Sequence, residues 1–283
     1  MLSAKCFFRG NYMTGPAAEG LLRNLCSVAE LAPEFWNIYE PINNPFRQEN
    51  MNEVIYGSMV PAEKAKKDFI RTLAFFVRRT KPRYLVSIDL RLAPVQWGTA
   101  HNRILIHVEE AWPGGEQKLA QYLLSSVLPN FPDYAKVVDS SQEDSERLNE
   151  FRRPLTPQEL VESFAKRAVT APFGPYGCLE DIYWFNYFGP VYVDFIGRAR
   201  LLAAGWPHVE EIGGGLACYA SEAIDAPNAR KQRLRIASAL EEFVWTPGCK
   251  AEDKKVPVFD FTEQFAALPA EALAKLEGCP LVS

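Results

Sequence analysis

Two of the three histidines and one glutamate fall at alternating positions along a stretch expected to form a β-strand, Arg103–Ala111. Because side chains on one face of a strand recur every second residue, His101, His107 and Glu109 would lie on the same face. Imidazole nitrogens and a carboxylate are metal ligands. The spacing matches no HExxH, HxH or 2-His-1-carboxylate pattern, so an ordinary histidine-bearing strand face is the alternative, and we expect no metal.

Motifs for nucleophilic catalysis and for phosphate binding do not occur in the sequence. It contains no GxSxG elbow and no cysteine in a papain-like setting. The run Gly213–Gly215 lacks the lysine and the serine or threonine of a P-loop, and a hairpin turn accounts for it. The carboxylates of Glu109–Glu110, Glu210–Glu211 and Glu241–Glu242 are adjacent and would point to opposite faces of a strand. We therefore expect no catalytic residue, no cofactor and no enzymatic activity.

The composition indicates a globular protein with a substantial core. Of the 283 residues, 48% are hydrophobic and 23% are charged, and the net charge is −4. A chain of this charge lacks the basic field that collects around phosphate, so no nucleic-acid partner is expected. Basic residues are concentrated in Lys64–Arg83, which we interpret as a solvated helix face, with an anion-binding patch as the alternative.

Cysteine usage and the lengths of the apolar runs indicate a cytoplasmic protein. The six cysteines are scattered, with no C-x-x-C pair, so buried free thiols in a reducing compartment are expected. The N-terminus has no signal-peptide pattern. The longest apolar runs, such as Leu73–Val77, are far too short to span a membrane.

Hydrophobic periodicity in the first half of the chain predicts helices packed on strands. Strands are expected over Lys5–Met13, FWNIYEP, Tyr84–Leu92, Arg103–Ala111 and AKVVDSS, and helices from Pro16, over Pro61–Arg79 and over Gly114–Val127. The segment APVQWGTAHN would join the two central strands as antiparallel neighbours.

The second half of the chain is organised around the aromatic stretch YWFNYFGPVYVDFIGRARLLAAGW. It predicts a strand over Ile182–Phe188, a Phe-Gly-Pro turn and a helix over Pro190–Ala204, which Gly205 ends because glycine readily adopts the left-handed conformation. The other predicted elements are a helix over Pro154–Ala168, a hairpin around Gly213–Gly215, a helix over Arg230–Val244 with Leu234 on its apolar face, and a short strand in VFDFT.

These elements predict an α+β fold in which helices pack on antiparallel sheets. The order of elements is similar in the two halves of the chain. We place an N-terminal half at residues 1–139, a polar linker or loop at residues 140–153 and a C-terminal half at residues 154–283. The alternative is that all three form one compact domain.

The stretch WFNYFGPVYVDFIGRARLLAAGW, followed by VEEIGGGLACYAS, resembles bacterial polymorphic-toxin immunity proteins, and in particular the immunity protein 52 family. The RGNY, EFWNIYEP and SIDLRLAPVQWG segments also look similar to the first half of that family. Specific residues match only over Tyr183–Ser221, whereas the order of elements is similar over most of the chain. Related type VI secretion immunity families share a YFGP…GR passage.

The resemblance implies a cytoplasmic, non-catalytic inhibitor that binds a toxin encoded by a neighbouring gene and occludes its active site. Toxins of this group look like nucleases, which need positive charge to hold phosphate, so an acidic inhibitor surface would attract one. We select acidic residues of the polar loop and two tryptophans at strand ends as toxin-binding candidates: Asp139, Glu143, Asp144, Glu146, Trp97 and Trp112. Two alternatives are an enzyme with a site near His101, His107 and Glu109, and an interaction protein unrelated to toxins.

Overall fold

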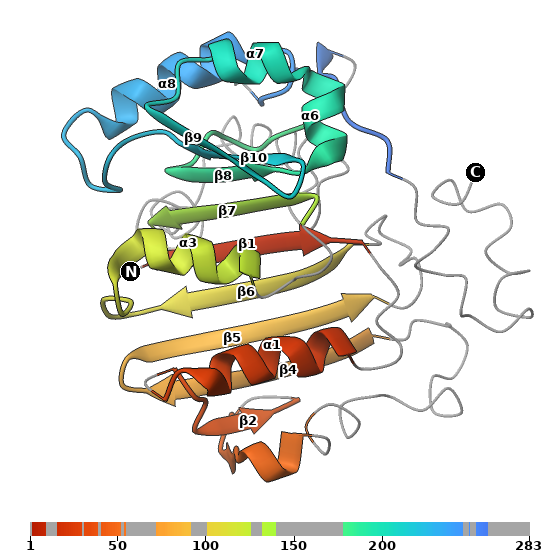
Figure 1. Ribbon diagram of the computed structural model, residues 1–283, viewed down its shortest axis with the longest axis vertical. Coiled ribbons are helices and arrows are strands. Elements are labelled where there is room, and N and C mark those ends of the chain that lie inside the picture. Colours follow the sequence, from red (N-terminus) through yellow and green to blue (C-terminus); the bar gives the residue numbers. More distant parts are fainter. Residues whose placement is uncertain are drawn as a thin grey trace, which may run out of the picture. The chain divides into compact units, whose positions relative to one another are not determined.

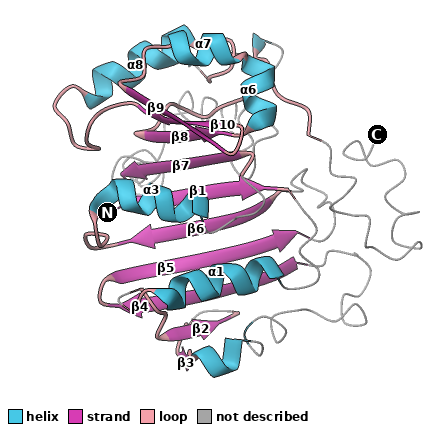
Figure 2. Ribbon diagram, in the orientation of Figure 1, coloured by secondary structure: helices cyan, strands magenta, loops and turns pink. Residues whose placement is uncertain are grey.

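A computed structural model describes the strands and helices of this chain (Figures 1 and 2). The described residues are 2–9, 16–29, 31–38, 41–51, 54, 72–91, 101–125, 132–139, 178–245, 249 and 253–259. The predicted linker at residues 140–153 and the predicted helix over Pro154–Ala168 lie outside them.

The described strands form a ten-stranded sheet in the order β3-β2-β4-β5-β6-β1-β7-β8-β10-β9. The strand pairs whose registers are resolved are all antiparallel, and helices pack on the strands, which confirms the predicted α+β class. The chain divides into two compact units, one of residues 1–4 and 132–259 and the other of residues 5–131 and 260–283. The division passes through β1, Leu2–Phe8.

The unit of residues 5–131 contains an antiparallel series of strands. Its elements are α1 (Pro16–Ser27), β2 (Phe35–Asn37), β3 (Asn44–Pro45), the 3-10 turn η1 (Gln48–Asn50), β4 (Thr72–Thr80), β5 (Arg83–Arg91), β6 (Asn102–Val108) and α3 (Gly115–Ser125). Strand β5 pairs with β4 on one side and with β6 on the other. The alternating sequences of β5 and β6 predicted the second of these pairings. Helices α1 and α3 lie on the same face of these strands, and Asn24 of α1 donates to the carbonyl of Ser125 over 3.4 Å (Figure 1).

The prediction of a helix over Pro61–Arg79 is wrong for its C-terminal part, because Thr72–Thr80 forms strand β4. Nine residues of β4 pair with β5, from Thr72 opposite Arg91 to Thr80 opposite Arg83. The sequence TLAFFVRRT contains two threonines, a valine and two phenylalanines, which favour an extended backbone. A long partner strand satisfies its backbone groups, so tertiary pairing overrides the helical spacing of its apolar residues.

The unit of residues 132–259 places an aromatic core between short strands and three helices. Its elements are β7 (Tyr134–Asp139), β8 (Phe185–Phe188), α6 (Pro190–Ile196), α7 (Arg198–Ala203), β9 (His208–Ile212), β10 (Gly215–Tyr219) and α8 (Ala229–Ala239). Strand β8 lies between β7 and β10, and β9 pairs with β10. The ring of Phe188 contacts those of Tyr134, Tyr192 and Trp206 at centroid distances of 5.9, 6.1 and 5.9 Å.

The Phe-Gly-Pro turn and the glycine hairpin form as predicted. Pro190 occupies the first turn of α6, where its missing N–H costs nothing. Gly213 and Gly214 have φ values of 59° and 79° and connect β9 directly to β10, as a two-residue hairpin turn requires. Gly205 follows α7 with φ 91°, the left-handed conformation expected at a helix end.

Three predicted elements of this unit differ in extent. The helix over Pro190–Ala204 is two helices, because Gly197 at φ 94° breaks it between Ile196 and Arg198. The helix over Arg230–Val244 ends at Ala239, and Leu234, expected on its apolar face, is 61% exposed. The described part of VFDFT, up to Phe259, is not a strand.

Candidate functional site

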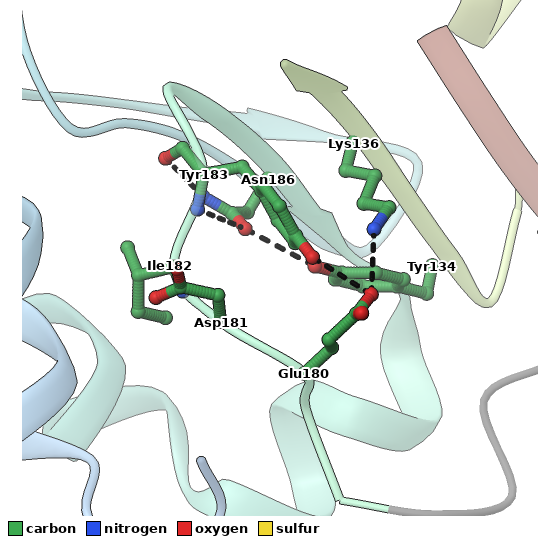
Figure 3. A network of polar contacts seen from close by, with 7 residues as sticks. All are labelled: Tyr134, Lys136, Glu180, Asp181, Ile182, Tyr183 and Asn186. Carbon is green, nitrogen blue, oxygen red and sulfur yellow. Dashed lines mark hydrogen bonds and ion pairs between the residues drawn. The ribbon is translucent and has the colours of Figure 1, made fainter. Parts of the chain in front are cut away.

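A buried polar cluster in the unit of residues 132–259 surrounds Lys136 on β7 (Figure 3). The side chain of Lys136 is 6% exposed, and its Nζ lies 3.2 Å from Oε2 of Glu180. The same ammonium lies 3.8 Å from the centroid of the Tyr183 ring. The Tyr183 hydroxyl donates to Glu180 Oε2 over 2.9 Å, so one carboxylate oxygen accepts from both neighbours.

Asn186 on β8 extends this cluster to the backbone before the strand. Its Oδ1 accepts from the Tyr134 hydroxyl over 3.1 Å and from the Tyr183 amide over 3.3 Å, while its Nδ2 donates to the Tyr183 carbonyl over 2.8 Å (Figure 3). Asn186 is fully buried. A buried amide bonded in this way fixes the chain reversal that leads into β8, because buried polar groups are stable only when they are hydrogen-bonded.

The geometry of this cluster suits rigidity better than reaction chemistry. The cluster joins β7 to the segment before β8, and the aromatic core of the unit lies on the same strands. Sequence analysis missed these residues, although a single lysine in the apolar stretch YAKVVD could have drawn attention to Lys136.

A second charged cluster links α7 to the chain after α8. The Glu242 carboxylate accepts from Arg200 over 2.9 Å and from Lys255. Both cations also lie over the Phe243 ring, at 4.9 and 5.9 Å from its centroid. Hydrogen bonds from Arg200 and Lys255 lower the pKa of Glu242 from its ordinary 4.5 to about 2.

The histidines selected from the sequence do not form a metal cluster. His101 is buried, at 1% exposure, and His107 is half-buried on β6 opposite Leu85. Glu109 forms an ion pair with Arg83 at 3.1 Å. Within the part of the chain that the structure describes, no three His, Cys, Asp or Glu side chains are placed to hold a metal ion.

The cysteines are free thiols wherever the structure describes them. Cys6, Cys178 and Cys218 are buried, and Cys26 and Cys249 are half-buried. Burial raises the pKa of Cys178 to about 12 and raises that of Cys218 as well. Such thiols are protonated and unreactive at neutral pH.

The six candidate toxin-binding residues are only partly described. Trp97, Glu143, Asp144 and Glu146 lie outside the described residues. Asp139 is half-buried at the end of β7. Trp112 is 3% exposed and packs between Tyr84 and Tyr122 at centroid distances of 5.8 and 5.6 Å, so its burial counts against the surface role expected for it. Toxin binding by this set stays a prediction.

Comparison with known proteins yields a likeness of fold. No protein-family model matches the chain, and no curated protein matches its sequence, so the resemblance to the immunity protein 52 family has no family match behind it. A solved structure, the Pseudomonas aeruginosa T6SS protein PA0821, is similar to the chain with a TM-score of 0.50 and 14% identity. The similarity covers 98% of this chain and 86% of that chain. The α+β fold is therefore one also found in a protein of the type VI secretion system (T6SS).

No helix within the described residues is both long enough and apolar enough to cross a membrane.

Proposed function

We propose that this chain is an immunity protein that binds a cognate secreted toxin and neutralises it by covering the toxin's active site. The observation that carries the proposal is the likeness to a T6SS protein over 98% of the chain. A likeness of this extent concerns the whole architecture and not one supersecondary motif. The YFGP…GR passage supports it further, because related type VI secretion immunity families share that passage.

The passage has a structural role compatible with this function. Its aromatic residues are core: Phe185, Tyr187 and Phe188 are fully buried, and the Gly-Pro pair begins α6. With a rigid core of this kind, the exposed residues of an immunity protein can vary to match different toxins without loss of the fold. We therefore assign inhibition to exposed residues and stability to the aromatic passage.

A nuclease-type toxin and a cytoplasmic site of action complete the proposal. The chain has a net charge of −4 and a pI near 5.6, whereas a nuclease presents positive charge where it holds phosphate. Opposite charge steers association and accelerates it. A protein that protects its own cell from such a toxin acts in the compartment that contains the nucleic acid.

The experiment is co-expression of the chain with the product of the neighbouring gene, followed by co-purification and a viability assay. We expect a stoichiometric complex and survival of cells that die when the toxin is expressed alone. Absence of a complex together with absence of rescue would reject the proposal. The double variant His101→Ala, His107→Ala is the control for an enzymatic role. If it folds, a binding protein should still rescue the toxin-expressing cells without these histidines.

A further inference from the structure

Helix α8 carries an unusual concentration of positive charge for a chain with a net charge of −4. Its sequence ARKQRLRIASA contains four cations and no acidic residue: Arg230, Lys231, Arg233 and Arg235. Among the described residues, no ion pair involves Arg230, Lys231 or Arg233. The helix therefore presents positive charge that takes part in no ion pair among the described residues of its unit.

The exposed face of α8 also contains a large apolar side chain. Arg230, Lys231, Leu234 and Arg235 are exposed and share one side of the helix, since they follow the i, i+1, i+4, i+5 spacing. Leu234 is 61% exposed. We call these four residues the α8 face.

The position of α8 is fixed by contacts outside the α8 face and at its edge. Ala229 and Ile236 are buried, and Gln232 donates to the carbonyl of Gly205 over 2.6 Å. Arg235, at the edge of the α8 face, donates to the same carbonyl over 2.8 Å. Leu202, near the end of α7, is also exposed, at 47%. The α8 face is thus held on a fixed helix and is not a product of local disorder.

Two cations stand where a helix tolerates them least. Arg230 and Lys231 lie in the first turn of α8, beside the positive end of the helix dipole, and that turn contains no acidic residue. Asn228, at the N-cap position, makes no side-chain capping bond. Local stability favours an acidic residue or a capping bond here, so these two cations do not serve to stabilise the helix.

We infer that the α8 face binds an acidic surface of the cognate toxin, with Leu234 inserted into an apolar depression on it. The inference rests on the proposed function and names the part of the molecule that makes the contact. It places carboxylates of the toxin against α8, separate from the cationic surface with which the toxin holds nucleic acid.

A protein surface fits the α8 face better than a nucleic acid. Proteins that bind single strands stack bases on exposed aromatic rings. The exposed large apolar side chains of the described residues are all aliphatic: Val28, Leu202, Leu234, Val256 and Val258. An exposed leucine surrounded by arginine is an arrangement suited to a protein interface, where apolar anchors are ringed by polar groups.

The test compares charge reversal on α8 with the same change on α3. Lys231→Glu and Lys118→Glu both replace an exposed lysine in the first turn of an 11-residue helix. Glutamate is favourable at either position, so neither variant should lower the Tm. The measurement is the Kd for the purified neighbouring-gene toxin, with association rates at 50 and 300 mM salt. The effects of Arg230→Glu with Lys231→Glu and of Leu234→Ser are measured in the same assay.

We expect the double reversal to weaken the complex at least tenfold, mainly through slower association, and Leu234→Ser to weaken it through faster dissociation. Lys118→Glu should leave the Kd within twofold of wild type. If the wild-type complex forms and the α8 variants bind equally well, the assignment of the surface is wrong while the proposed function stands. If no wild-type complex forms, both are wrong. If the wild-type protein binds a DNA duplex and the α8 variants lose that binding but still bind the toxin, α8 is a nucleic-acid surface and the inference is overturned.

Discussion

The side chains of Lys136 and Glu180 differ in solvent exposure, and removing one or the other should therefore change the stability of the fold by different amounts. The Lys136 side chain is 6% exposed and that of Glu180 is 27% exposed. Removing one partner of a buried ion pair leaves the other charge uncompensated, and the cost rises with the burial of the charge that is left.

The first prediction is therefore that Glu180→Gln destabilises the fold more than Lys136→Met. We expect Glu180→Gln to lower the free energy of unfolding by about 3 kcal/mol, because it leaves a buried ammonium. Lys136→Met should cost less, since the Glu180 carboxylate can hydrate and methionine still packs on the Tyr183 ring. Urea unfolding at constant m-value measures both, with Tyr183→Phe as the control for the phenol bond. Equal costs would contradict the burial argument.

The second prediction concerns the pH dependence of the Glu242 cluster. The pKa of Glu242 is lowered from 4.5 to about 2 by Arg200 and Lys255, so its contribution to stability is complete above pH 4.5 and is lost as the pH falls toward 2. We expect the difference in Tm between wild type and Glu242→Gln to be constant from pH 5 to pH 8 and to shrink below pH 4.5. Glu241→Gln is the control, since Glu241 is adjacent and has no ion pair among the described residues. A Tm difference that persists unchanged at pH 2.5 would refute the assignment.

At the scale of elements, two glycines should respond in opposite directions to alanine. A Cβ at Gly215, the first residue of β10, would lie 2.6 Å from Cζ of Tyr187 and also against the carbonyl oxygen of Phe188. A Cβ at Gly20, inside α1, would meet nothing within 4 Å. The close approach of β10 to β8 therefore requires glycine, whereas α1 does not.

The third prediction follows from this contrast. Gly215→Ala should destabilise by roughly 1–3 kcal/mol, because a backbone carbonyl cannot move aside without disturbing the β8–β10 pairing. Gly20→Ala should stabilise by roughly 0.5–1 kcal/mol, because alanine is the better helix former. Both changes add one methyl group, so thermal unfolding of the pair separates packing from hydrophobicity. A stabilised Gly215→Ala would show that β10 is less tightly held than its contacts indicate.

At the scale of the whole molecule, net charge opposes the local charge of α8. With a net charge of −4, the chain as a whole repels a polyanion at long range. The fourth prediction is that wild-type protein does not shift a 30-base-pair DNA duplex at 150 mM salt and micromolar concentration. The Arg230→Glu, Lys231→Glu double variant provides the comparison. A shift that wild type causes and this variant does not would contradict the reading of α8 as a protein-binding face.

Much of the fold was determined by the sequence because short-range rules sufficed. The alternating residues of β5 and β6 predicted neighbouring antiparallel strands, and the Phe-Gly-Pro turn predicted where β8 gives way to a helix. The glycines at 213 and 214 predicted a hairpin, since few other residues adopt positive φ at adjacent positions. Each of these features depends on residues close together in the chain.

Other features depended on contacts between distant residues. Thr72–Thr80 has the spacing of a helix, yet it pairs with β5 and is a strand. Lys136 and Glu180 are 44 positions apart, so nothing in the sequence indicated that they form an ion pair. Trp112, selected as a surface anchor because it follows a strand, is buried between two tyrosines from β5 and α3. Sequence determined the local turns and most of the alternating strands. Burial and pairing, which depend on residues brought together only by folding, decided the strand at Thr72–Thr80 and which side chains are core.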